Sequence, residues 1–273
     1  MQMMRNPEHM GMPIAFGRES EIFDIGIGKI LKLYSAGFPK EKIAREFQNV
    51  QAVSRVVGDL VPHAVEQRVV NGRHGIVFEK ISGKSFMDLF QEKPVLYFTQ
   101  SEVLANIARK IHSFEVAGVP TQLESFSELI QSTNRLTKQE RAVLMGLLKK
   151  SKAKKLCHGD FHHGNVIKTD EGRIVVIDWM DAFVGDPALD IALTAVNAMV
   201  SDAPAHIPQT YRLMYELLKK VLRLDKKVIK RYPEISQQRM KEAIVLAAGI
   251  HLARKEGDFR EHRKYFDLAI TIS

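Results

Sequence analysis

The sequence predicts an α+β protein with two lobes: a small β-rich lobe that contains one helix, and a larger lobe that is mainly helical. Three observations support this prediction. The chain of 273 residues is long enough for two small domains. β-Prone runs and turn signals occupy about the first 80 residues, and helix-start signals dominate after them. We therefore expect residues 1–81 to form the first lobe and residues 82–273 to form the second.

The first lobe is expected to contain two β-hairpins and a helix between them. Gly26 and Gly28 suit a turn with positive φ, and Asn71-Gly72 is a strong hairpin signal. Pro39 can open the helix at its first position. The helix has apolar residues at helical spacing, namely Ile43, Phe47, Val50 and Val53. The expected strands span residues 22–25, 29–33, 64–70 and 75–81.

The second lobe is expected to be helical with one inserted hairpin. Capping-box patterns begin at Thr99 and Thr137. The expected helices lie near residues 100–116, 138–150, 187–200, 209–222 and 234–255. The hairpin pairs residues 166–168 with residues 173–177 through a turn at 169–172. A short linker near residues 80–84 predicts a cleft between the lobes.

Composition favours a cytoplasmic protein without a membrane segment. The single cysteine, Cys157, cannot form an internal disulfide, and the amino terminus lacks the apolar run of a signal peptide. The formal net charge is +8, and residues 217–264 account for all of it. Such a segment either binds a polyanion such as nucleic acid or forms a solvated helical face. Interspersed acidic residues and the lack of a nucleic-acid motif favour the solvated face.

Three oxygen-bearing side chains suggest phosphoryl transfer. Asp160 and Asn165 have the spacing of the base and metal ligand in a kinase catalytic loop. Asp178 follows the apolar strand that pairs back toward Asn165. A four-residue turn would place Asn165 opposite Val176, so that Asn165 and Asp178 could share one Mg²⁺. The alternative interpretation is that each residue only caps a turn.

The first lobe offers a cation for the phosphates of ATP. Lys32 lies on an expected strand, and Glu46 lies on the apolar side of the expected helix. A buried carboxylate is costly unless it is paired, so we expect Glu46 to pair with Lys32. The competing interpretation is that Glu46 lies at the edge of that face or pairs elsewhere.

Other motifs carry less weight. His158, His162 and His163 could bind a transition metal, but no fourth soft ligand is evident. The segment around Gly83 does not fit the P-loop pattern, because Phe78 stands where the first glycine is required. Asp190 lies near the start of an expected helix, where the positive end of the helix dipole stabilises its charge; this explains the residue without any further function.

Three motifs, HGDFHHGN at 158–165, IDWMD at 177–181 and GDPALD at 185–190, resemble the aminoglycoside phosphotransferase and choline kinase superfamily. The resemblance covers residues 14–200 and implies a protein-kinase-like fold with ATP and Mg²⁺ as cofactors. It implies that Asp160 is the catalytic base and that Asn165 and Asp178 bind the metal. Lys32, supported by Glu46, would contact the phosphates.

The same resemblance assigns further residues. Ser20 would touch phosphate, Ile81 would meet adenine through its backbone with Glu79 beside it, and His158 and Asp190 would support the catalytic loop. The acceptor would be a hydroxyl of a small molecule, since no peptide-binding activation segment is present. The alternatives are a catalytically silent nucleotide-binding regulator and a polyanion-binding protein. The sequence indicates neither the acceptor nor the oligomeric state.

Overall fold

The computed structural model describes residues 11–93, 96–151, 153–200, 224–254 and 259–272. The chain forms two compact units, each built from separate stretches. The first unit comprises Met1–Leu96, Val116–Val119 and His163–Ala182, and the second comprises Tyr97–Glu115, Pro120–His162 and Phe183–Ser273. Strands dominate the first unit and helices the second, which confirms the predicted α+β fold class. The lobe boundary after residue 81 stays a prediction.

The first unit is built on a five-stranded antiparallel sheet with the strand order β1-β2-β3-β5-β4. Its strands are β1 (Ala15–Phe16), β2 (Ser20–Gly26), β3 (Lys29–Tyr34), β4 (Ala64–Val70) and β5 (Arg73–Glu79). Both predicted hairpins are present. Asn71 and Gly72 have φ values of 50° and 77°, as a two-residue hairpin turn of type I′ requires.

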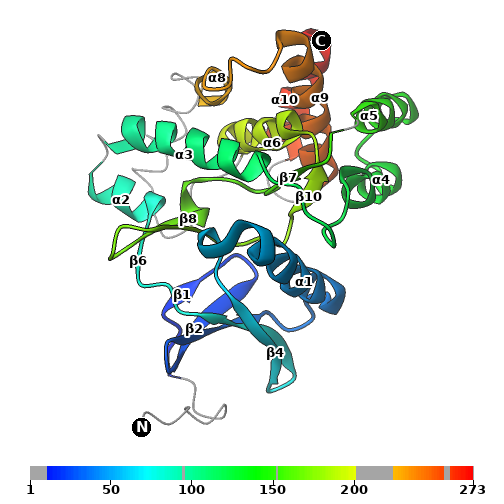
Figure 1. Ribbon diagram of the computed structural model, residues 1–273. Coiled ribbons are helices and arrows are strands. Elements are labelled where there is room, and N and C mark those ends of the chain that lie inside the picture. The colour runs from blue at the N-terminus through cyan, green and yellow to red at the C-terminus, as the bar shows by residue number, and fades with distance from the viewer. Residues whose placement is uncertain (1–10, 94–95, 152, 201–223, 255–258, 273) are drawn as a thin grey trace. The chain divides into compact units, whose positions relative to one another are not determined.

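One helix, α1 (Lys40–Val57), lies beside this sheet and contacts β4 and β5 (Figure 1). Ile43, Val50 and Val53 of its apolar stripe are buried, as the periodicity predicts, and Phe47 is half-buried. Pro39 is the residue before the helix rather than its first residue, because its ψ of 122° is extended. Two polar residues, Glu46 and Asn49, share the buried face with the apolar stripe.

A second, three-stranded sheet in the same unit has the order β6-β8-β9. Its strands are β6 (Gly83–Ser85), β8 (Val166–Thr169) and β9 (Ile174–Val176), and the helix α2 (Phe86–Glu92) follows β6. The turn between β8 and β9 is one residue shorter than predicted, because the Thr169 N–H donates to the Arg173 carbonyl at 2.8 Å. Asn165 consequently pairs with Ile177 rather than with Val176.

The second unit is helical, with a small β7–β10 ladder. Its elements are α3 (Leu96–His112), α4 (Gln122–Ser132), α5 (Lys138–Lys150), β7 (Lys155–Cys157), β10 (Phe183–Gly185), α6 (Pro187–Val200), α8 (Leu224–Ile229), α9 (Gln237–Ala253) and α10 (Phe259–Ile272). The helices α6 and α9 pack against each other, and α10 packs against α9 (Figure 1). None of the helices that the structure describes is long and apolar enough to span a membrane.

The helix-start predictions gave mixed results. The capping box at Thr137 is present, since its side chain accepts from the Glu140 N–H and Glu140 returns the bond. The box predicted at Thr99 is wrong, because α3 begins at Leu96 and Thr99 lies inside the helix. The helix expected at 209–222 lies outside the described residues. The helices α2, α4, α8 and α10 were not predicted.

Candidate active site

Lys32 is the centre of a charged cluster in the first unit. Its Nζ lies 2.8 Å from Glu46 Oε1 and 3.0 Å from Asp178 Oδ1. The three side chains come from β3, α1 and the segment after β9. The Glu46 side chain is 1% exposed and that of Lys32 is 15% exposed, so the pair is shielded from water. The expected Lys32–Glu46 pair is therefore present.

Burial acts on both members of this pair. It raises the pKa of Glu46 to about 7, although Lys32 acts in the opposite direction. Burial alone would lower the pKa of Lys32, but the carboxylates of Asp178 and Glu46 outweigh it and raise that pKa. The Tyr34 hydroxyl donates to the second oxygen of Glu46. Lys32 is thus a fixed cation at neutral pH.

Asp178 has an unusual backbone conformation. Its φ is 65°, in the left-handed region that costs a non-glycine residue about 1 kcal/mol. The preceding residue, Ile177, still donates its N–H to the Asn165 carbonyl at 2.9 Å. Asn165 and Ile177 therefore form the last pair of this hairpin, and Asp178 follows directly after it. Such strain is typical of functional sites, where surrounding contacts hold the residue in place.

The donor chemistry of Asn165 and Asp178 fits Mg²⁺, which prefers carboxylate and carbonyl oxygens. The Asp178 side chain is 42% exposed, so its carboxylate is accessible to an ion. It already contacts one cation, the Lys32 ammonium. Both residues fit a magnesium site on chemical grounds.

Asn49 fixes the segment that follows Asp178. Its side-chain N–H₂ donates to the carbonyls of Trp179 at 3.0 Å and Met180 at 3.2 Å. Trp179 is fully buried and donates its Nε1–H to the Val176 carbonyl at 2.8 Å. The sequence analysis missed Asn49. A signal was available, because Asn49 lies three residues after Glu46 on the apolar stripe of the same helix.

In the second unit, Asp160 is held by polar side chains. Asn197 on α6 donates its Nδ2–H to Asp160 Oδ1 at 3.0 Å, and His162 Nε2 lies 3.5 Å from Oδ2. Burial opposes ionisation of Asp160, but His162, His158 and Arg254 outweigh it and lower the pKa of this carboxyl. Asp160 is therefore ionised at neutral pH. Asn197 was missed, since nothing local in the sequence links it to Asp160.

Asp190 organises the loop that carries Asp160. Its two oxygens accept the backbone N–H groups of His158 at 3.0 Å and Gly159 at 2.8 Å. His112, at the end of α3, contacts Asp190 Oδ2 through Nε2 at 2.8 Å. Gly159 has a φ of 82°, a conformation that favours glycine. His112 was missed by the sequence analysis, because its link to Asp190 is visible only in three dimensions.

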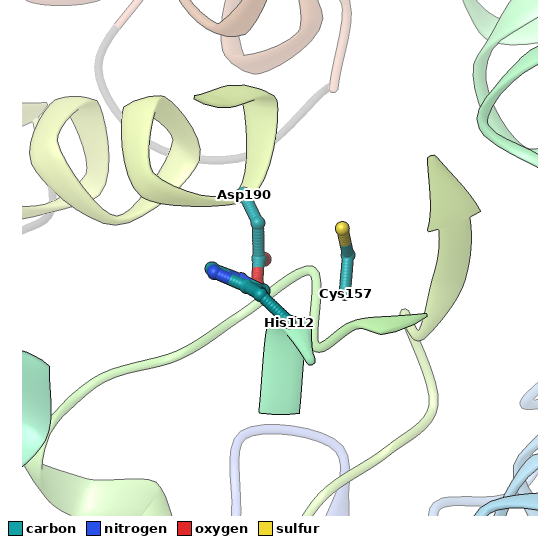
Figure 2. A group of neighbouring side chains, drawn as sticks. All are labelled: His112, Cys157 and Asp190. Atoms are coloured by element: carbon teal, nitrogen blue, oxygen red, sulfur yellow. The ribbon is translucent and has the colours of Figure 1, made fainter. Parts of the chain in front are cut away.

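Figure 2 shows the Cys157 thiol near Asp190 and His112. One ligand atom from each lies within 4.8 Å of the others, and all three residues are buried. Burial raises the pKa of Cys157 and keeps the thiol protonated. Both Asp190 oxygens already accept backbone hydrogen bonds, so the arrangement is better suited to support than to metal binding. Among the described residues, His158, His162 and His163 form no comparable group.

The remaining predicted nucleotide-binding residues, Ser20, Glu79 and Ile81, lie in the first unit. Ser20 is buried at the start of β2, and its carbonyl accepts the Gly17 N–H at 2.8 Å, closing a tight turn. Glu79 donates its backbone N–H to the His63 carbonyl at 3.0 Å. The backbone of Ile81, just beyond β5, bonds no other residue that the structure describes. Unpaired main-chain groups of this kind are available to a ligand.

Comparisons with known proteins identify relatives at the level of family. A profile of the phosphotransferase enzyme family matches residues 12–226. The resemblance inferred from the three motifs is thereby confirmed. A search of curated proteins finds no match.

Solved structures with the same fold include several small-molecule kinases. A thermostable mutant of the aminoglycoside phosphotransferase APH(4)-Ia is 18% identical, with a TM-score of 0.59 over 96% of this chain and 92% of that chain. The choline kinase LicA from Streptococcus pneumoniae is 16% identical, with a TM-score of 0.54 over 94% and 90%. A ternary complex of APH(2")-IIa with streptomycin and ATP is also 16% identical, with a TM-score of 0.54 over 95% and 90%. At these identities the likeness establishes the fold.

Proposed function

Since the chain belongs to the phosphotransferase enzyme family, we propose that it transfers the γ-phosphoryl group of ATP to a hydroxyl of a small molecule. The observation that carries this proposal is the partly buried Lys32, held between Glu46 and Asp178. A shielded cation beside a strained, accessible carboxylate is what binding of a metal–triphosphate complex needs. ATP is present in the complex of the fold relative APH(2")-IIa, which supports the choice of nucleotide.

In this proposal the first unit handles the nucleotide. Lys32 contacts the α- and β-phosphates, and Glu46 holds the lysine in position. Asn165 and Asp178 hold Mg²⁺, which neutralises the charge on the phosphates when it is bound. Ser20 contacts phosphate from its turn.

The adenine base would lie against the segment after β5. The unpaired backbone groups of Ile81 are available to the edge of the adenine ring. Glu79 lies two residues earlier in the chain. A main-chain contact of this type positions the nucleotide without requiring a particular side chain, which explains why the sequence marks the position only weakly.

Asp160 acts as the general base and accepts the proton of the attacking hydroxyl. Its low pKa means that the proton moves late, as the bond to phosphorus forms, rather than in a separate earlier step. Asn197 orients one oxygen of the carboxylate. Asp190 and His158 hold the loop, and His112 holds Asp190.

The decisive experiment replaces the base. Asp160→Asn keeps the size of the side chain but removes the proton acceptor, so we expect kcat to fall about 10³-fold while ATP still binds. The control is Asp170→Asn, an exposed aspartate in the β8–β9 turn. ADP release from a panel of hydroxyl compounds measures turnover, and calorimetry measures ATP binding. Undiminished turnover in Asp160→Asn would overturn the proposal, whereas tight ATP binding without turnover of any acceptor would indicate a silent regulator.

A further inference from the structure

Tyr34 is a buried tyrosine next to Lys32 in the first unit. It is the last residue of β3. Lys32 lies two residues earlier on the same strand, so the two side chains leave the same face of the sheet. The Lys32 Nζ lies 5.3 Å from the centre of the Tyr34 ring. Tyr34 therefore belongs to the immediate surroundings of the lysine.

The Tyr34 hydroxyl provides the second donor that the Glu46 carboxylate needs. Glu46 Oε1 accepts from the Lys32 Nζ at 2.8 Å, and Glu46 Oε2 accepts from the Tyr34 hydroxyl. The terminal torsion of a glutamate side chain is soft, so a carboxylate that is held through one oxygen can still rotate. With a donor on each oxygen, the plane of the Glu46 carboxylate is fixed. The two bonds also offset the cost of burying this charge.

The Tyr34 ring is held in place independently of its hydroxyl. It stacks on the ring of Phe38, with the centroids 4.8 Å apart and an angle of 21° between the planes. The Tyr34 carbonyl accepts the Arg73 Nε–H at 2.8 Å, and Arg73 forms an ion pair with Glu21 on β2. The hydroxyl therefore reaches Glu46 from a ring whose position is already fixed.

Tyr34 is also in register with the turn that carries Ser20. The two residues are partners across the β2–β3 ladder. The next residue, Ser35, donates both its backbone N–H and its hydroxyl to the Glu19 carbonyl, at 2.9 and 3.2 Å. Two of the residues that we expect to contact phosphate thus lie close to Tyr34 in the sheet, Ser20 directly across from it and Lys32 two positions along its own strand.

Resting on the nucleotide site proposed above, we propose that Tyr34 is a positioning residue for the binding of ATP. Its hydroxyl orients the Glu46 carboxylate, and Glu46 in turn holds the Lys32 ammonium where the α- and β-phosphates bind. Tyr34 contacts neither the nucleotide nor the reacting atoms, so its whole effect on ATP passes through Glu46. Because Lys32 keeps Asp178 as a second partner, loss of the hydroxyl weakens ATP binding without abolishing it.

The test is a double-mutant cycle on Tyr34 and Glu46, in which calorimetry measures the Kd of the full chain for ATP in the presence of Mg²⁺. Tyr34→Phe removes only the hydroxyl and should raise the Kd about 10-fold, since a hydrogen bond to a charged group is lost. Glu46→Ala should raise the Kd at least as much. The double variant Tyr34→Phe/Glu46→Ala should match Glu46→Ala within about 2-fold, because the hydroxyl then has no carboxylate to orient.

A purely structural role for Tyr34 predicts a different pattern. Tyr34→Phe would then weaken ATP binding by the same factor in the wild type and in Glu46→Ala, and this additive result would overturn the proposal, as would an unchanged Kd in Tyr34→Phe. The matched control is Tyr232→Phe, which removes the hydroxyl of a buried tyrosine in the second unit and should leave the Kd unchanged.

The cycle still decides if Tyr34→Phe alone fails to fold because Glu46 Oε2 has lost its donor. The double variant lacks that oxygen, so it avoids the cost of an unsatisfied buried atom. A Kd equal to that of Glu46→Ala supports the proposal, and a further loss of affinity contradicts it.

Failure of the phosphotransferase function has a separate signature, because ATP binding is measured without any acceptor. If no hydroxyl compound releases ADP but ATP binds and the cycle is non-additive, the transfer reaction fails and the positioning role stands. If Asp160→Asn abolishes the turnover of the wild type but the cycle is additive, the positioning role alone fails. If the wild type does not bind ATP, both fail.

Discussion

Two regions hold their functional side chains in place in different ways: the Lys32 cluster, formed by Lys32, Glu46 and Asp178, and the Asp160 loop, which runs from His158 to Asp160. The Lys32 cluster is held by direct contacts between charged side chains, with Lys32 bound to both Glu46 and Asp178. The Asp160 loop is held mainly through its backbone, since Asp190 accepts two main-chain N–H groups. Substitutions in the Lys32 cluster should therefore affect function more than stability, and substitutions that release the Asp160 loop should affect both.

The largest effect expected for the Lys32 cluster is on catalysis. Lys32→Met removes the cation from the nucleotide site, and we expect kcat/KM for ATP to fall about 10²- to 10³-fold. Glu46→Ala should lower it less, because Lys32 retains Asp178 as a partner. The exposed Glu41 on the same helix provides the control variant Glu41→Gln. Steady-state kinetics with ATP as the varied substrate measures the effect, and a wild-type value for Lys32→Met would remove the basis of the comparison.

The Asp160 loop should respond to Asp190→Ala with a loss of stability. Two buried N–H groups and His112 lose their acceptor, so the free energy of unfolding should fall by about 3 kcal/mol. Urea denaturation measures this change, with the exposed Asp170→Ala as control. A change no larger than that of the control would mean that the loop does not depend on Asp190.

Asn49 tests whether the Lys32 cluster also depends on its backbone. Asn49→Leu leaves the carbonyls of Trp179 and Met180 without their donor, and we expect a loss of about 2 kcal/mol in the free energy of unfolding. Gln48→Leu, at the neighbouring exposed position, is the control. Equal stability of the two variants in urea would show that side-chain charges alone position Asp178.

The difference between the two regions also explains what the sequence could predict. Lys32 and Glu46 are readable, because a carboxylate on an apolar helix face needs a cation and a strand lysine lies nearby. The hairpin behind Asn165 was predicted with the wrong register, since one residue of turn length moves every pairing. His112 and Asn197 could not be predicted, because their contacts with Asp190 and Asp160 link elements far apart in the chain. Local pattern carries no information on such contacts.

The smallest predicted effect is that of pH on the free energy of unfolding, and it has opposite sign in the two regions. Glu46 has a folded-state pKa near 7, above its ordinary 4.5, so the folded state holds the proton more tightly. Its contribution to stability is complete below pH 4.5 and is lost as pH rises through 7. From pH 6 to pH 8 the free energy of unfolding should fall by about 1 kcal/mol in the wild type relative to Glu46→Gln, which cannot titrate.

The pKa of Asp190 is lowered instead, against the effect of burial, by His112 and the backbone N–H of His158. Its contribution to the free energy of unfolding is present above pH 3.8, its ordinary pKa, and is lost as pH falls below that value. The difference in the free energy of unfolding between the wild type and Asp190→Asn should therefore become smaller only in acid. Chemical denaturation at several pH values measures both trends with the same material. If the free energy of unfolding changed in parallel for the wild type and Glu46→Gln between pH 6 and pH 8, Lys32 would stabilise the Glu46 carboxylate enough to cancel the effect of burial. The pKa of Glu46 would then not be raised, and the opposite pH dependence of the two regions would disappear.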